Sequence, residues 1–275
     1  MKKFFIYFFL TAGAVIMIYP LIWLIGASFK SNDEIFSSLW FMPEKFDFSV
    51  YEKAWQTVTG YSMGHYFINT FMIIIPKTFF AVISSTLVAY GFARFDFPLK
   101  KIFYALFMGS MFMPAIVMII PVYLIWNRTG LLDTYIPLTI PALFAGEGTF
   151  VFMLIQFIKG LPKELDEAAR IDGCNSLQIL IYILVPCLRQ VIVSISVFTF
   201  LWTMNDFLNP LIIVSSVEKY PLSLILRLST DSTGNGYEQN KILAMSVVGL
   251  IPSITVFALA QKKFIGGITV GGLSK

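Results

Sequence analysis

Six long apolar runs, separated by more polar segments, constrain the fold more than any other feature of this chain. The runs cover residues 4–28, 66–92, 103–126, 135–158, 191–214 and 242–261. Each is close to the ~20 residues that an α-helix needs to cross ~30 Å of hydrocarbon. Lipid offers no partner for a free backbone N–H or C=O, and the runs lack the alternating polarity of barrel strands. The sequence therefore predicts an all-α membrane protein with about six transmembrane helices.

The composition agrees with this class. Hydrophobic residues make up 57% of the chain and charged residues only 13%, whereas a soluble domain carries about 25% charged residues. So few charges cannot cover a water-facing surface. We therefore expect one transmembrane domain over residues 1–275, surrounded by membrane lipid. The net charge of +4 is scattered and includes no dense basic block, so we expect no nucleic-acid partner.

The distribution of Lys and Arg predicts the orientation in the membrane. With the N-terminus inside, about twelve cations lie on the inner side and about seven on the outer side. We therefore expect a multi-pass protein of the cell membrane with both termini in the cytoplasm. The first run, residues 4–28, exceeds the about 7–15 residues of a signal-peptide core, so we expect it to remain as a span. Cleavage after the small residues 26–28 is the alternative.

One inner segment, residues 159–190, is long enough to carry a function of its own, and residues 161–173 within it predict a short, water-facing helix. Pro162 suits the first helical position, and Gly173 suits a left-handed stop. Small side chains recur at i, i+3, i+4 and i+7 on this helix: Leu165, Ala168, Ala169 and Asp172. Such a narrow face suits insertion into a cleft of another protein. A surface helix that merely joins two spans explains the spacing equally well.

The string Glu167-Ala168-Ala169, with Gly173 four residues after it, resembles the EAA loop of ATP-binding-cassette (ABC) importer permeases. The fuller string over residues 161–173 is similar to the carbohydrate-uptake branch, the maltose-importer type of inner-membrane permease. The resemblance implies a type I ABC importer permease fold, in which this loop is a coupling helix that docks onto an ATPase subunit. Carried onto this chain, the docking residues are Glu167, Ala168, Ala169, Asp172 and Gly173.

The same resemblance implies the partners: a second permease subunit forming a heterodimer, two ATPase subunits and an extracytoplasmic sugar-binding protein, in a bacterial inner membrane. The chain contains no G-x-x-x-x-G-K-[ST] phosphate loop, H-E-x-x-H or G-x-S-x-G string. We therefore expect no catalytic residue, metal or cofactor, with ATP bound by the separate subunits. The expected function is import of a sugar or oligosaccharide, not enzymatic catalysis. A stand-alone ion-coupled transporter or channel is the alternative.

Three charged residues, Lys77, Glu147 and Asp206, fall inside apolar runs. A charge at the bilayer centre costs about 2.5–3.5 kcal/mol on insertion scales, so each should face protein or water. One interpretation pairs Lys77 with Glu147 and puts Asp206 near the outer interface; pairing is common for such charges. The other makes them a wall of the sugar pathway. Trp202, which can stack on a sugar ring, and Asn205 complete the pathway candidates.

Overall fold

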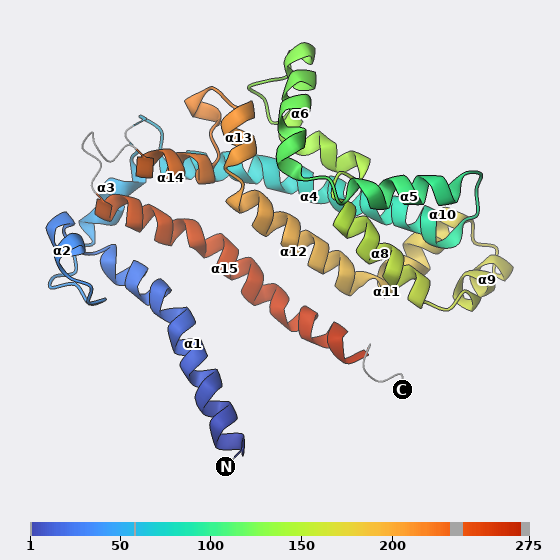
Figure 1. Cartoon of the computed structure of the whole chain (residues 1–275), viewed down its shortest axis with the longest axis horizontal. Helices are drawn as coiled ribbons and strands as arrows, with labels where there is room; N and C mark the ends of the chain where they lie inside the picture. Colours follow the sequence, from blue (N-terminus) through green and yellow to red (C-terminus); the bar gives the residue numbers. More distant parts are fainter. Residues whose placement is uncertain (1, 58, 232–238, 271–275) are drawn as a thin grey trace. The chain divides into compact units, whose positions relative to one another are not determined.

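The computed structural model describes residues 2–57, 59–231 and 239–270, and this part of the chain contains helices and no strand (Figure 1). The all-α prediction is therefore confirmed. The chain divides into two compact units, Met1–Asn69 with Tyr220–Pro252, and Thr70–Lys219 with Ser253–Lys275. Two long helices, α4 (Met63–Arg94) and α15 (Gln239–Val270), run through both units. The expectation of a single transmembrane domain stays a prediction.

The first unit contains α1 (Lys2–Ala27), the short helices α2 (Asn32–Ser37) and α3 (Ser49–Trp55), and α14 (Leu222–Asp231), besides parts of α4 and α15. Its most unusual feature is Lys30, whose side chain is fully buried. The Lys30 ammonium donates hydrogen bonds to the backbone carbonyls of Ser38 and Trp40. These bonds replace the water that a buried cation loses, and they hold the segment after α2 against the end of α1.

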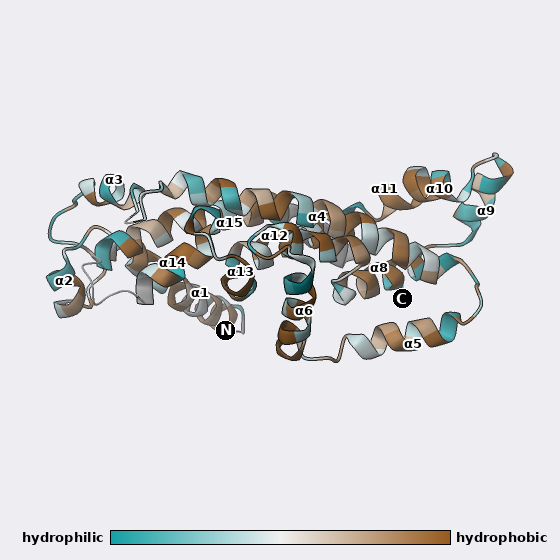
Figure 2. Ribbon diagram, turned by 90° about the horizontal axis from the view of Figure 1, so that it is seen from above, coloured by the Kyte–Doolittle hydropathy of each residue, from teal (hydrophilic) through white to brown (hydrophobic). Residues whose placement is uncertain are grey.

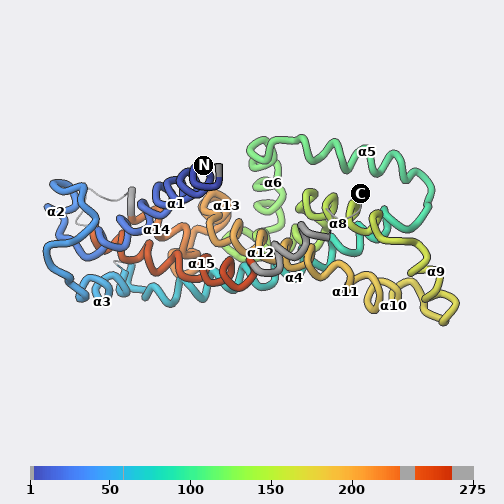
Figure 3. The backbone as a smooth tube through the Cα atoms, turned by 90° about the horizontal axis from the view of Figure 1, so that it is seen from below, coloured from blue at the N-terminus to red at the C-terminus, as the bar shows by residue number. Residues whose placement is uncertain are grey.

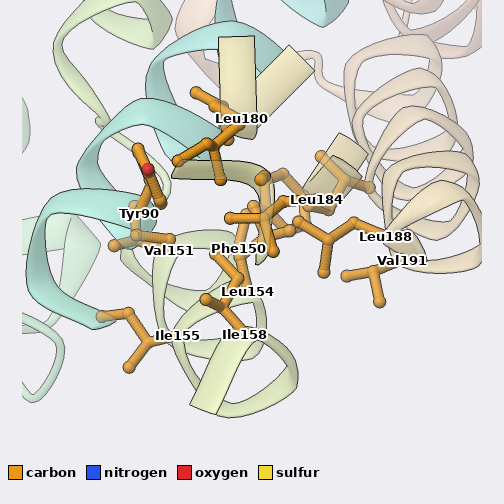
Figure 4. Close-up of a cluster of buried hydrophobic side chains, with 14 residues drawn as sticks. Tyr90, Phe150, Val151, Leu154, Ile155, Ile158, Leu180, Leu184, Leu188 and Val191 are labelled. Atoms are coloured by element: carbon orange, nitrogen blue, oxygen red, sulfur yellow. The ribbon is translucent and has the colours of Figure 1, made fainter. Parts of the chain in front are cut away.

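The second unit holds the main core. Its helices are the rest of α4, α5 (Lys100–Ser110), α6 (Ala115–Thr129), α7 (Ile136–Thr139), η1 (Ile140–Phe144), α8 (Gly148–Gly160), α9 (Glu164–Ile171), α10 (Ser176–Gln178), η2 (Ile179–Leu184), α11 (Val185–Cys187), α12 (Arg189–Asn205), α13 (Leu208–Ile213) and η3 (Val217–Lys219), with the end of α15. Helix α8 is central, because Phe150, Leu154 and Ile158 are at most 1% exposed. Figure 4 shows these side chains packed with Leu184 and Leu188. Between membrane helices such contacts stabilise the unit by van der Waals packing rather than by removal of side chains from water.

The described ranges contain four to six possible membrane spans, which agrees with the predicted number of about six. By length and composition, four helical stretches can cross a membrane: Lys3–Ala27, Met63–Arg94, Ile136–Gly160 and Gln239–Gln261. The number rises to six if each of two bent pairs is counted as one span: Lys100–Ser110 with Ala115–Thr129, at 103°, and Ser176–Cys187 with Arg189–Asn205, at 79°.

The third and fifth runs are broken, contrary to the continuous spans that the sequence suggested. Helix α5 ends at Ser110 and α6 begins at Ala115, after a sharp change of direction that Figure 3 shows clearly. Pro114 precedes α6 and has no N–H to continue a helix. The fifth run ends early, because α12 stops at Asn205 and α13 is a separate helix.

Residues 176–187 lie in the inner segment 159–190, outside the six predicted apolar runs. They form the helical stretch α10–η2–α11, of which η2 is π-helical. Ile179, Leu180 and Leu184 on this stretch are buried in the core of the second unit. The stretch therefore packs into the second unit and is not a free loop.

Candidate docking helix and polar pocket

The predicted short helix is α9, but it begins at Glu164, so the assignment of Pro162 to the first helical position is wrong. The carbonyls of Leu161 and Pro162 instead accept hydrogen bonds from Arg94 Nη2, at 3.0 and 3.4 Å. The helix starts where the Lys163 carbonyl accepts from the backbone N–H groups of Asp166 and Glu167, at 2.9 and 3.1 Å. The last residue of α4 thus binds the two residues that precede the N-cap of α9.

The end of α9 is as predicted. Gly173 has a φ of +86° and takes the left-handed conformation that stops the helix. Its N–H bonds to the Arg170 carbonyl at 3.0 Å, and the Cys174 N–H reaches back to the Ala169 carbonyl at 2.9 Å. These two bonds make a Schellman motif, which satisfies carbonyls that the helix end leaves open. No atom lies within 4 Å of a Cβ built on Gly173, so the backbone conformation, not space, requires glycine here.

An ion pair fixes α9 to α4. The Arg94 Nε lies 2.6 Å from the Asp166 Oδ2, and the two side chains are only 4% and 10% exposed. One turn earlier on α4, the Tyr90 hydroxyl donates to the Ser176 carbonyl at 3.1 Å. Sequence reasoning missed this connection. The available signal was that Asp166 shares a helix face with Ala169 and that Arg94 ends an apolar run.

The exposed face of α9 differs from the predicted one. Ala169 is 5% exposed and belongs to the core, so it is not available to a partner. The other predicted docking residues are exposed: Glu167, Ala168, Asp172 and Gly173. The outward stripe runs through Glu164, Glu167, Ala168 and Ile171. Ile171, which sequence reasoning missed, is 87% exposed on a helix that Figure 2 shows to be largely hydrophilic.

Three intramembrane charges meet in one polar pocket of about 210 Å³. Lys77 comes from α4 next to Pro76, Glu147 directly precedes α8, and Asp206 directly follows α12. Asn209 of α13 completes the polar lining. All three charged residues thus lie at a proline or at a helix end, where the regular backbone is interrupted.

The pairing interpretation of Lys77 with Glu147 is wrong: within the described residues, no ion pair or side-chain hydrogen bond joins them. Asp206 accepts hydrogen bonds from the backbone N and the Nδ2 of Asn209, at 3.2 and 2.8 Å. Trp202 and Asn205 lie outside the pocket lining. The Trp202 ring stacks on Phe150, with centroids 5.2 Å apart, and Asn205 bonds to the carbonyl of Leu201.

A second polar cluster, which sequence reasoning missed, surrounds Asp133 in the turn before α7. Its carboxylate accepts from the backbone N–H groups of Ser215 and Ser216, both at 2.9 Å, from Ser216 Oγ at 2.6 Å and from Lys219 Nζ at 2.7 Å. Burial alone would raise the pKa of Asp133, but the hydrogen bonds from Lys219 and Ser216 outweigh burial and hold that pKa well below its usual range. The cluster joins the turn after α6 to the segment after α13.

The chain is similar to known membrane transport proteins in its sequence and in its fold. Residues 81–265 match the family model described as binding-protein-dependent transport system inner membrane component. A diacetylchitobiose uptake system permease protein of Streptomyces coelicolor is 27% identical over 94% of this chain and 84% of its own length. An arabinooligosaccharides transport system permease protein of Halalkalibacterium halodurans is 30% identical, with 94% and 92% covered. A crystal structure of a bacterial ABC transporter involved in the import of the acidic polysaccharide alginate matches with a TM-score of 0.77. Its identity is 24%, with 96% of this chain and 97% of that chain covered, and it shows the fold.

Proposed function

The chain belongs to the family of binding-protein-dependent transport system inner membrane components, and from this premise we propose that it passes a sugar or oligosaccharide into the cytoplasm, driven by ATP hydrolysis on separate ATPase subunits. The expected ABC importer permease fold is confirmed by the structural match. The alternative, a stand-alone ion-coupled transporter, lacks comparable support from the relatives, which are named as permease proteins.

The observation that carries this proposal is the two-sided construction of α9. Its inner side is held to α4 by the Arg94–Asp166 ion pair and to the core by Ala169. Its outer side presents Glu167, Ala168 and Ile171 to solvent. A helix held this firmly moves with α4 when a partner pulls on its outer side. ATP can shift the permease between two states only through contacts that differ between them, and α9 offers such contacts.

Each exposed residue of α9 has a distinct part in the proposed docking. Ile171 supplies apolar surface that an ATPase cleft would remove from water. Ala168 lets the partner approach the helix closely, and Glu167 supplies a charge for a basic group. Gly173 and Asp172 end the helix, and the left-handed Gly173 leaves the surface without a side chain. Ala169 acts from inside, as a packing residue.

The remaining components follow from the family. We assign a second permease subunit, two ATPase copies and an extracytoplasmic binding protein, with both termini of this chain in the cytoplasm of a bacterium. The excess of Lys and Arg on the inner side supports this orientation. One relative is named for arabinooligosaccharides, which are neutral, and the structural match is involved in the import of an acidic polysaccharide. These names therefore do not indicate whether the substrate of this chain is charged.

Reconstitution tests the proposed function. The complete set of subunits is placed in liposomes with the binding protein outside and ATP inside, and uptake of labelled oligosaccharides is followed. We expect uptake only when both ATP and the ATPase subunits are present. Uptake by this chain alone, driven by a proton or sodium gradient, would instead establish the ion-coupled alternative.

A further inference from the structure

We propose that the polar pocket of Lys77, Glu147, Asp206 and Asn209 binds one ring of a neutral or amino sugar and rejects acidic sugars. This inference rests on the proposed function and deepens it, because it assigns a substrate class to a pocket within this chain. The pocket lies wholly in the second unit; its polar groups come from α4, from α13, and from the residues directly before α8 and directly after α12.

The charges of the pocket decide the substrate class. Two acidic side chains, Glu147 and Asp206, face the cavity with one basic side chain, Lys77. A uronate or a phosphorylated sugar would bring a third negative group beside the two carboxylates, and like charges at such short range repel each other. A neutral sugar brings only hydroxyl groups, and an amino sugar adds a cation that restores the balance. The pocket therefore selects against anions.

The lining also suits the shape and chemistry of a sugar ring. Carboxylates accept hydrogen bonds from sugar hydroxyls, and the Lys77 ammonium donates them. Buried apolar side chains, Leu138 and Ile213, form another part of the wall, against which the C–H face of a ring can pack. At about 210 Å³ the cavity is below the ~300–1,000 Å³ of a typical small-molecule site, so it suits one ring of a longer chain.

The backbone around the pocket supports a binding role. In a membrane, irregular backbone is tolerated where it is buried in protein or lines a polar cavity, and transporters place their binding sites at broken helices. Here α8 begins after Glu147, α12 ends before Asp206, and Pro76 interrupts α4 beside Lys77. A larger cavity of about 540 Å³ in the same unit is lined by apolar residues with only Thr78 and Ser196 as polar members, so it lacks this chemistry.

The pocket is also mechanically connected to α9. Helix α4 carries Lys77 at the pocket and Arg94 at α9, about 25 Å apart at 1.5 Å per residue. Helix α8 likewise runs from Glu147 to the segment that precedes α9. Figure 1 shows α9 at the opposite end of these helices from α13. A sugar in the pocket and an ATPase on α9 therefore act on the same two helices.

Saturation-transfer NMR on the assembled transporter in lipid nanodiscs, without the binding protein, tests the inference. The probes are methyl β-D-glucopyranoside, glucosamine and glucuronate. We expect the first two to bind at least about tenfold more tightly than glucuronate. Glu147→Gln and Lys77→Met should each weaken binding of the neutral probe about tenfold or more, because the first replaces a charged acceptor with a neutral one and the second removes a charged donor. Glu147→Lys should raise the affinity for glucuronate.

Two exposed residues outside the pocket provide matched controls: Glu52→Gln and Lys101→Met should leave all three affinities unchanged. Equal binding of glucuronate, no binding of any probe, or binding insensitive to every pocket variant would overturn the inference. These outcomes are independent of the proposed function, which ATP-driven uptake tests separately. If a pocket variant does not fold, the comparison of the three probes on the wild-type assembly still decides.

Discussion

The guanidinium of Arg94, the last residue of α4, forms a nearly buried ion pair with Asp166 of α9, with Nε and Oδ2 2.6 Å apart. The same guanidinium donates to the carbonyls of Leu161 and Pro162. One side chain thus holds both the entry to α9 and its first turn. We infer that a movement of α9 is transmitted to α4 through this ion pair.

Removing one partner of this pair should be costly. Asp166→Ala leaves the Arg94 cation buried without its counter-charge, and such losses cost about 3–5 kcal/mol in the free energy of unfolding. The measurement is denaturant unfolding in detergent micelles. Asp96→Ala is the matched control, because the Asp96–Lys100 pair is at the surface, with Asp96 fully exposed, and should change stability by about 0–1 kcal/mol. Equal effects of the two variants would remove the structural role of the buried pair.

Ile171 should contribute more to ATPase association than any charge on α9. Ile171→Asp removes an exposed apolar side chain whose burial is worth about 1.5–3 kcal/mol, so affinity for the ATPase should fall by about ten- to hundredfold. Leu99→Asp is the control, since Leu99 is also exposed, at 62%, in another turn that we place on the inner side. Affinity is measured by binding of purified ATPase to the permease in nanodiscs. An unchanged affinity in Ile171→Asp would contradict the docking face described above.

Glu167→Lys reverses a charge on the same stripe. We expect the variant to insert into the membrane normally, because Glu167 is exposed and outside the spans, but to recover little ATPase on co-purification. Recovery of the full complement of ATPase would show that Glu167 is not in the interface.

Substitutions of Gly173 test the backbone conformation at the end of α9 rather than the exposed surface of this helix. Its φ of +86° is unfavourable for side chains with a Cβ, but Asn tolerates it better than Ala or Val. We therefore expect Gly173→Val to destabilise the protein by about 1–2 kcal/mol and Gly173→Asn by less. Thermal unfolding in detergent provides the comparison. Because the space around Gly173 is open, a steric clash cannot cause a difference between the two variants, and equal losses would contradict the role of the left-handed backbone.

Acid should weaken the polar cluster in which the Asp133 carboxylate accepts hydrogen bonds from Ser215, Ser216 and Lys219. Its pKa in the folded protein is below the ordinary value of 3.8, so the carboxylate stabilises the fold above about pH 4. That contribution is lost as the pH falls through the lower, folded-state pKa, when the group becomes protonated. Asp133→Asn should therefore be less stable than the wild type at pH 7, and the gap should narrow as the pH falls below 3.8. A gap independent of pH would exclude the ionised carboxylate as its cause.

The sequence was sufficient for the number of spans, because the absence of water in lipid forces each long apolar run to be helical. It was insufficient to predict where the helices break and in which direction they continue. The run over residues 103–126 contains the break at Pro114, and apolar character does not report the direction of a helix. Residues 176–187 lie outside the predicted apolar runs, yet they are helical, and Ile179, Leu180 and Leu184 pack into the core.

The candidate site was likewise predictable from the sequence only in part. The EAA string and Gly173 identified α9 and its end correctly, because local propensity and helix-stop chemistry are readable from neighbouring residues. The orientation of the helix depends on Arg94, which is distant in the chain, and so Ala169 was assigned to the wrong side. The three intramembrane charges were correctly selected, but their meeting in one pocket without a Lys77–Glu147 pair depends on tertiary structure.

The most direct test of the account asks whether α9 is the surface that the ATPase covers. Ala168→Cys is made in a chain whose own Cys174 and Cys187 are replaced by Ser, and a membrane-impermeant thiol reagent is applied to right-side-out and inverted vesicles, with and without ATPase. We predict labelling only from the cytoplasmic side, and protection when the ATPase is bound, whereas Leu99→Cys stays labelled in both conditions. Labelling of Ala168→Cys from outside the cell, or labelling that the ATPase does not reduce, would contradict the account.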